Sequence, residues 1–142
     1  MTEYIGDKLR AKYPSLFANR CEISVDEGWF SILDALCSGI VHHLQHNKNV
    51  IDFAKRKHAT EPTITSSIPD LIPDVQIVQI KEKFGTLRFY FHDGDDYIRG
   101  AAAFAEDMSA LTCEVCGHPG KARGGGWIKT LCELHAKIEN RT

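Results

Sequence analysis

Two short motifs near the C-terminus constrain this chain more than any other feature. The first is Cys113-x-x-Cys116, the second is Cys132-x-x-His135, and fifteen residues separate them. Thiolate sulfur and imidazole nitrogen are the donors of tetrahedral metal sites, and two tight turns at this spacing bring four such donors together. Gly117 suits a turn that wraps around an ion. The pattern predicts a zinc site with Cys113, Cys116, Cys132 and His135 as ligands.

Three other interpretations of these motifs stay open at this point. A thioredoxin-like redox pair needs a helix that starts at the first cysteine, whereas Gly117, Pro119 and Gly120 follow this pair at once. His118 could replace His135 as the fourth ligand without changing the kind of site. A catalytic zinc ion keeps one position for water, whereas four protein ligands close the site. The sequence therefore favours a structural zinc ion.

Length and composition indicate one compact core with a small metal-held unit. The chain has 142 residues, 43% of them hydrophobic, which suffices for a single buried core. We expect a core domain over residues 1–112 and a zinc-binding knuckle over residues 113–142, coupled to that core. Of five cysteines, Cys21 and Cys37 remain as single thiols outside the predicted site. An odd number argues against a disulfide framework and favours a reducing cytoplasm.

Hydropathy and charge argue against a membrane-spanning protein and against a typical nucleic-acid-binding protein. The chain has neither a signal-peptide pattern at its start nor eighteen consecutive apolar residues, so we expect no membrane span. The formal net charge is −2. Residues 61–112 carry nine acidic against four basic side chains, whereas residues 113–142 carry three against five. This small excess of basic residues near the C-terminus does not make the clear basic face that is typical of a nucleic-acid-binding protein.

Hydrophobic periodicity predicts helices in the first half of the chain. A short helix over residues 3–12 ends before Pro14, because a residue before proline avoids the helical region. Ser24 to Glu27 match a capping box at the start of a long helix, with Asp26 as a competing cap. That helix presents one apolar stripe of Trp29, Leu33, Leu36, Ile40 and Leu44. Proline, serine and threonine then predict an irregular connection over residues 58–74.

From residue 75 onward the period changes to two, which predicts β-strands. Residues 75–80 form one strand with a slip in the alternation, and residues 87–91 form a second. Between them Lys83, Phe84 and Gly85 supply a hairpin turn, with Gly85 where positive φ is needed. The expected fold class is α+β, with helices packed on a β-hairpin or small antiparallel sheet and a C-terminal zinc ribbon or knuckle.

A second amphipathic helix follows the hairpin. The acidic run of residues 93–96 is expected to cap it, because carboxylates at a helix start interact favourably with the helix dipole. Its apolar stripe is Tyr97, Ala101, Phe104, Met108 and Leu111. Gly100, Ala102 and Ala105 are small enough for close packing on the hairpin. This helix leads directly into Cys113.

Several stretches of the chain together resemble one protein family. Residues 78–90 read VQIKEKFGTLRFY, residues 113–120 contain CxxCGxPG, and residues 126–135 contain GWxxTLCxxH. With Gly28 and Trp29, this combination resembles a family of small zinc-knuckle proteins from bacteriophages and bacterial genomes. The resemblance implies a cytoplasmic, phage-linked origin and carries over no catalytic residue. Accessory phage proteins of this size often bind and redirect host machinery, including defence systems.

The absence of a nucleophile motif or a phosphate loop favours a non-catalytic zinc-binding protein that binds and modulates a protein partner. The loop between the two ligand pairs is the expected contact surface, because it combines basic and aromatic side chains with three consecutive glycines. The expected contacts are Lys121, Arg123, Trp127 and Lys129. Trp127 could instead close the small core under the zinc ion.

Two other functions remain open from the sequence. The same loop could bind nucleic acid, with Arg123 and Lys129 neutralising phosphates and Trp127 stacking on a base. An enzyme would need an open zinc position with Glu114 or Glu133 as a base. The H-x-E…P-C-x-x-C order of the zinc deaminases is absent, which argues against that alternative.

Overall fold

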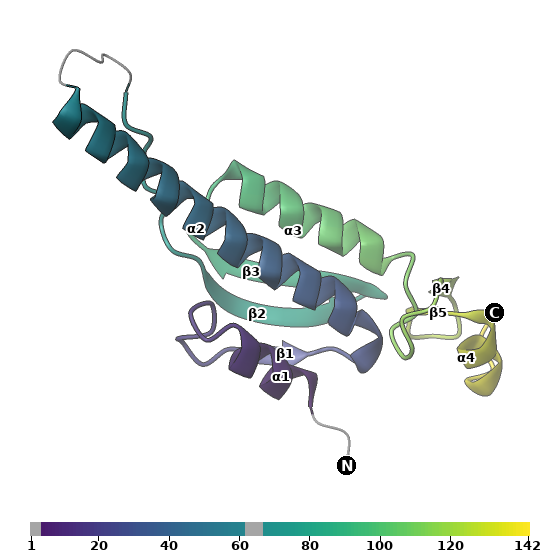
Figure 1. The fold of residues 1–142 in the computed structure, drawn as a ribbon. Helices are drawn as coiled ribbons and strands as arrows, with labels where there is room; N and C mark the ends of the chain where they lie inside the picture. Colours follow the sequence, from purple (N-terminus) through teal and green to yellow (C-terminus); the bar gives the residue numbers. More distant parts are fainter. Residues whose placement is uncertain (1–3, 62–66) are drawn as a thin grey trace.

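A computed structural model describes residues 4–61 and 67–142 and shows helices packed on small sheets (Figure 1). In chain order the elements are α1 (Ile5–Lys12), β1 (Glu22–Ser24), the 3-10 turn η1 (Glu27–Trp29), α2 (Phe30–Thr60), β2 (Gln76–Lys83), β3 (Thr86–His92), α3 (Asp96–Ser109), β4 (Lys121–Arg123), β5 (Lys129–Leu131) and α4 (Glu133–Ile138). This is the α+β class expected from the sequence.

The main sheet has three strands in the order β1-β2-β3, and it is mixed rather than purely antiparallel. The predicted hairpin is the antiparallel pair β2–β3. The strand that sequence analysis missed is β1, which runs parallel to β2 with Ile23 opposite Ile80. A parallel pair needs a long crossover, and α2 supplies it. With only three residues, β1 is too short to show a periodic signal.

The hairpin confirms two details of the prediction. Its register shifts between Ile77 and Gln79, which is the slip expected in the first strand. Gly85 has the expected positive φ of 79°, and Phe84 also has a positive φ, of 54°. Two consecutive positive φ values are typical of a two-residue type I′ turn, whose twist matches that of the strands. An aromatic residue at such a position is unusual, because its Cβ crowds the backbone there.

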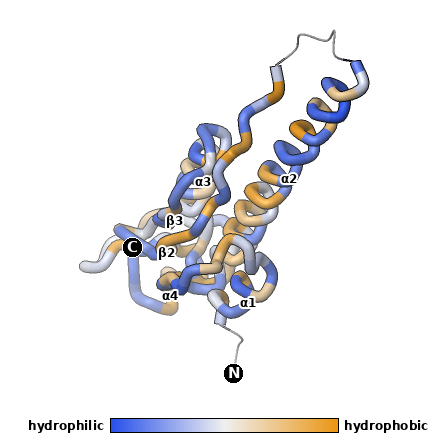
Figure 2. The backbone as a smooth tube through the Cα atoms, turned by 90° about the vertical axis from the view of Figure 1, so that its left-hand side faces the viewer, coloured by the Kyte–Doolittle hydropathy of each residue, from blue (hydrophilic) through white to orange (hydrophobic). Residues whose placement is uncertain are grey.

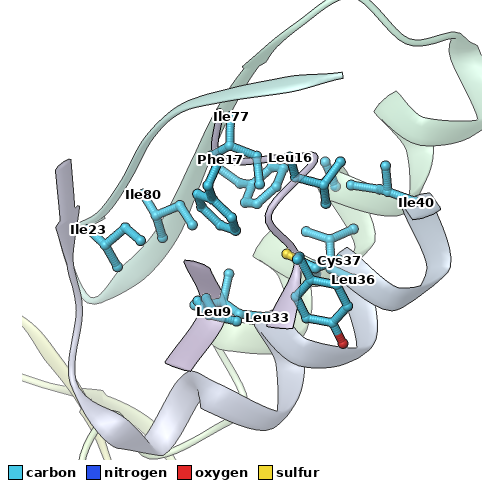
Figure 3. Packing of buried hydrophobic residues seen from close by; sticks show 14 of the residues in the cluster. Leu9, Leu16, Phe17, Ile23, Leu33, Leu36, Cys37, Ile40, Ile77 and Ile80 are labelled. Carbon is cyan, nitrogen blue, oxygen red and sulfur yellow. The ribbon is translucent and has the colours of Figure 1, made fainter. Parts of the chain in front are cut away.

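Helix α2 packs its apolar stripe against the sheet. The predicted Trp29, Leu33, Leu36, Ile40 and Leu44 are all buried, none exposing more than 8% of its surface. Figure 3 shows Leu33, Cys37 and Ile40 across the core from Ile77 and Ile80 of β2. From α1, which is the helix predicted at the start of the chain, Ile5 and Leu9 join the same core.

Helix α2 is longer than predicted, and its second half projects beyond the sheet (Figure 1). The irregular connection predicted from residue 58 begins only after Thr60; residues 67–75 have no helix or strand, and residues 62–66 lie outside the described residues. Figure 2 shows hydrophobic and hydrophilic residues recurring along the whole of α2. Among the described residues, no helix combines the length and the apolar character that crossing a bilayer requires.

The start of α2 corrects the predicted capping box. Asp26 and Trp29, which precede η1 and α2, make no capping hydrogen bond with their side chains. The amide of Gly28 instead donates to the backbone carbonyl of Glu114, at 2.8 Å. A partner distant in sequence therefore satisfies a donor at this helix start, where the sequence pattern indicated a local one.

Helix α3 buries a different face from the predicted one. Asp95 caps it as expected, by accepting a hydrogen bond from the amide of Ile98 at 3.1 Å. The residues that face the core are Ile98, Ala102, Ala105 and Ser109. Of the predicted stripe, Tyr97, Phe104, Met108 and Leu111 are exposed, with 63%, 67%, 37% and 60% of their surfaces accessible.

Polar contacts explain the orientation of α3. The outer edge of β3 offers amide groups, and two side chains of α3 accept from them: Ser109 Oγ from the amide of Leu87 at 2.8 Å, and Glu106 Oε2 from that of Phe89 at 2.9 Å. Leaving such donors unpaired in a buried setting costs free energy. These hydrogen bonds and the small Ala102 and Ala105 turn the larger apolar side chains outward.

The buried hydrophobic residues form two separate clusters. The large one lies between the helices and the three-stranded sheet and includes residues from Ile5 to Ala105. The small one consists of Cys113, Leu131 and Ala136. The boundary expected after residue 112 lies between these two clusters in the sequence. That the C-terminal segment is a distinct domain stays a prediction.

Candidate metal centre

The structure brings the four predicted ligands together at the end of the molecule where α3 ends (Figure 1). Cys113 and Cys116 lie in the turn after α3, Cys132 is the N-cap of α4, and His135 lies in the first turn of α4. One ligand atom from each residue lies within 4.8 Å of every other. Among the described residues this is the group of Cys, His and acidic side chains that could hold a metal ion.

Separations between the ligand atoms fit a tetrahedral ion. The Sγ atoms of Cys116 and Cys132 are 3.7 Å apart, and Nδ1 of His135 lies 3.7 Å from Cys113 Sγ and 3.2 Å from Cys132 Sγ. With metal–sulfur bonds of about 2.3 Å and metal–nitrogen bonds of about 2.0 Å, a tetrahedron places two sulfurs about 3.8 Å apart and sulfur and nitrogen about 3.5 Å apart. The residues present therefore fit a metal ion with four protein ligands.

Backbone hydrogen bonds shape the two ligand turns. The amide of Gly117 donates to the carbonyl of Cys113 at 3.0 Å, and the amide of Cys113 donates to the carbonyl of His118 at 2.8 Å. Gly117 has a φ of 80°, a conformation that residues with a Cβ rarely adopt. The β4–β5 hairpin, with Lys121 opposite Leu131, then returns the chain to the first turn. The fifteen intervening residues thus close one loop around the site.

The thiols have unequal tendencies to ionise. Burial opposes ionisation of Cys113, but the backbone amides of Cys132, Cys116 and Val115 hydrogen-bond its sulfur and lower its pKa to about 7. The backbone amide of His118 favours the Cys116 thiolate, yet burial and the neighbouring sulfurs raise the pKa of Cys116. Metal coordination requires thiolates. A cation at the centre would remove the repulsion between these sulfurs.

The geometry favours this ligand set over His118 as a ligand, over a redox pair and over an open catalytic site. His118 lies outside the group of four, and its Nδ1 is 3.2 Å from Cys116 Sγ, where it can orient that sulfur by a hydrogen bond. No helix begins at Cys113, unlike the thioredoxin arrangement. All five cysteines are free thiols. Four protein ligands fill a tetrahedral site, which leaves no position for substrate water.

Residues 113–142, which carry the four candidate ligands and are called the metal-binding segment below, are joined to the core through close backbone contacts. Gly28 lies so near to it that a Cβ on this residue would be 2.2 Å from the carbonyl oxygen of Cys113. On the hairpin, the carbonyl of Gly85 accepts from Thr130 Oγ1 at 2.6 Å. The indole of Trp29 donates to the carbonyl of Thr112 at 2.9 Å. Core and metal centre therefore pack without intervening side chains at Gly28.

Glu114 links both ligand turns to the core. Its carbonyl accepts from Gly28, its amide donates to the carbonyl of Thr130 at 2.9 Å, and its carboxylate accepts from the amide of Thr130 at 2.6 Å. The side chain is buried, and burial raises the pKa of Glu114 to about 7. Glu133, the other acid considered as a base, pairs with Arg123 at 3.3 Å. Both acids thus have structural hydrogen-bond partners.

The four predicted partner contacts do not form one accessible surface. Arg123 is buried, exposing 7%, and its Nε donates to the carbonyl of Leu131 at 3.1 Å. Lys129 pairs with Glu139 at 2.9 Å. Only Lys121 and Trp127 are exposed. The alternative that Trp127 closes the small core is wrong, because 67% of its surface is accessible; its indole donates to Glu82 at 3.1 Å.

Sequence reasoning missed the docking residues Gly28, Gly85 and Glu114 as parts of the site. Gly28-Trp29 and the hairpin sequence were already singled out by the family resemblance, and their contacts with the metal-binding segment give those motifs a structural role. Comparisons with protein-family models, with curated proteins and with solved structures found no match to this chain.

Cys132→Ser should abolish metal binding and unfold residues 113–142, because the binding free energy of a structural metal is also folding free energy. Metal content measured by plasma mass spectrometry should fall from one ion per chain to none, and amide hydrogen exchange in this segment should become fast. Cys21→Ser, which changes a thiol outside the cluster, is the matched control and should keep the ion. His118→Ala should also keep it; loss of the ion there together with retention in His135→Ala would refute the ligand set.

Gly28→Ala should separate the metal centre from the core, because the added Cβ overlaps backbone atoms of Cys113 and Glu114. We expect a loss of about 1–3 kcal/mol in the free energy of unfolding, as for other overpacked sites. Gly100→Ala is the control, since a Cβ there meets no atom within 4 Å; it should stabilise helix α3 by about 0.5–1 kcal/mol. Urea denaturation followed by circular dichroism measures both changes. Equal stability of the two variants would contradict the docking.

Proposed function

We propose that this chain is a non-catalytic zinc protein that binds and modulates a protein partner, with the ion stabilising the fold. A three-cysteine, one-histidine set at tetrahedral separations is the donor set of structural zinc sites. The resemblance to phage and bacterial zinc-knuckle proteins supports a phage-linked origin and a cytoplasmic protein of the bacterial host as the partner. In this proposal the loop over residues 121–129 is not the main contact surface for the partner, because Arg123 and Lys129 are engaged in internal contacts.

The observation that carries the proposal is the exposed apolar face of α3. Tyr97 and Phe104 each expose more than half of their surface, and Met108 lies on the same face. These side chains border a groove of about 480 Å³ between α3 and α2. Its lining is almost wholly apolar and includes Ile32, Ala35, Gly39, Ile98, Ala101 and Ala105. Exposed apolar surface of this kind is a common feature of interaction sites.

Shape and charge indicate what the groove binds. Gly39, Ala35 and Ala101 leave space that bulky apolar side chains of an amphipathic helix would fill. Together α3 and its N-cap carry four carboxylates, those of Asp95, Asp96, Glu106 and Asp107, against the single guanidinium of Arg99. A second copy would place two such acidic helices together, which is unfavourable. We therefore propose a helix with an apolar face and basic flanks as the partner.

Phe104→Asp should abolish partner binding without unfolding the chain, because the side chain is already exposed. A central aromatic contact contributes about 2 kcal/mol or more, so the dissociation constant should rise about 30-fold. Phe53→Asp is the matched control: Phe53 is 60% exposed on α2 and does not line the groove. Host proteins retained by immobilised wild type and Phe53→Asp, but not by Phe104→Asp, should be purified and titrated by calorimetry.

Two outcomes would contradict the proposal. Equal affinity of the purified protein for Phe104→Asp and Phe53→Asp would exclude the groove. Sedimentation velocity of the protein alone provides the second test: a dimer that dissociates in Phe104→Asp would show that a second copy covers this face. Zinc content measured on the same samples verifies that each variant retains the metal centre.

A further inference from the structure

A second surface, on the opposite side of the sheet from the helices, has a different chemistry. Along β2 and β3 the side chains alternate: Leu87 and Phe89 point into the core, whereas Arg88 and Tyr90 point outward. Helices α2 and α3 lie side by side along the hairpin (Figure 1) and pack on the inward residues. On the outward side, Tyr90 is 43% exposed. This outward side of β2–β3 is the open sheet face.

Three cations lie on the open sheet face. Lys81 is directly opposite Arg88 in the register, and Lys83 follows two residues later on the same side. In the part of the chain that the structure describes, none of the three forms an ion pair. Like charges directly opposite each other destabilise a sheet. On the neighbouring strand β1, the carboxylate of Glu22 accepts a hydrogen bond from Gln79 at 3.2 Å.

Aromatic rings accompany these cations. The ammonium group of Lys81 lies 5.7 Å from the ring centroid of Tyr90, and that of Lys83 lies 5.7 Å from the ring of Phe84. Phe84 exposes 70% of its surface although its positive φ is an unfavourable conformation for an aromatic residue. Strained residues of this kind cluster at functional sites. A hollow of about 380 Å³ adjoins Tyr90, lined among others by His92, Asp93 and Arg99.

We propose that the open sheet face binds single-stranded nucleic acid. Lysine and arginine side chains neutralise phosphates, while exposed aromatic rings stack on bases, and a β-sheet that presents both is a recurrent platform for single strands. A duplex would gain less, since its bases are already stacked on one another. The hairpin cannot enter the major groove as a ribbon, because its inner side is packed against α2 and α3.

The open sheet face is separate from the α2–α3 groove and from the loop over residues 121–129. The groove lies between α2 and α3, on the helix side of the sheet. Of the basic loop residues, Arg123 and Lys129 are held by internal contacts, whereas Lys81, Lys83 and Arg88 of the hairpin lie together on one face. Nucleic acid and a protein partner therefore do not compete for the same residues. One site can fail its test without affecting the result for the other.

The test is fluorescence anisotropy of labelled dT20 and rU20 with the zinc-loaded full chain. Neutralising three phosphates of a single strand gives a slope of about −2 in log K against log salt, which weakens binding about 20-fold between about 50 and 200 mM. Lys81→Gln with Arg88→Gln should weaken binding at least tenfold and reduce the slope to about −0.7. Tyr90→Ser should weaken it about tenfold while leaving the slope unchanged.

Matched controls separate this face from the rest of the molecule. Lys55→Gln with Lys121→Gln removes the same charge from exposed positions on α2 and the loop, and it should leave affinity unchanged. Tyr4→Ser removes a tyrosine that is 46% exposed at the start of α1 and should also have no effect. Circular dichroism and zinc content show whether each variant is folded. If the double hairpin variant is unstable, Lys83→Gln at the turn tests the same surface, with an expected weakening of about fivefold.

Four results would overturn the proposal. They are the absence of binding at 50 mM salt, equal loss in the hairpin and control variants, binding of a 20-base-pair duplex as tight as that of dT20, and binding of a labelled poly-glutamate peptide in place of nucleic acid. The last would assign the face to an acidic protein. Single-strand binding that depends on Lys81, Arg88 and Tyr90 but not on Lys55, Lys121 and Tyr4 supports the site.

Discussion

The close packing of the metal-binding segment on Gly28 is the contact on which the arrangement of this protein depends. The small buried cluster of Cys113, Leu131 and Ala136 is too little apolar surface to stabilise residues 113–142 alone. The hydrogen bonds through Glu114 tie this segment to the core, and a metal ion bound at the four clustered ligands would add folding free energy. The helix start at Gly28 and the hairpin turn at Gly85 are the surfaces that receive this segment.

The hairpin is shared by several parts of the molecule. Its inner side forms the core with α2, its free edge donates hydrogen bonds to side chains of α3, and its turn contacts the metal-binding segment through Gly85 and Glu82. The outward side of the hairpin takes no part in these contacts, and on it Lys81 lies directly opposite Arg88. A sequence selected for stability alone would place opposite charges there. The arrangement is consistent with a ligand that carries negative charge.

Two surfaces of opposite character thus lie on opposite sides of the sheet. The α2–α3 groove is apolar with acidic surroundings, and the open sheet face is basic with aromatic rings. Because the net charge is near zero, these differences do not show in the overall composition. A protein that held a protein partner on one side and a nucleic acid on the other would bring the two together.

The sequence by itself determined the elements whose signals are local. The two ligand pairs, the turn at Gly85 with the register slip before it, and the stripe of α2 follow from spacing and backbone preference. Only the tertiary structure decided the rest, since the deciding contacts join distant residues. The face of α3 that is buried is the one whose side chains accept hydrogen bonds from the edge of β3. The short strand at Ile23 forms because it pairs with Ile80, and Arg123 is buried because its guanidinium donates to the carbonyl of Leu131. Periodicity shows that a helix has two faces, but only its neighbours determine which one is covered.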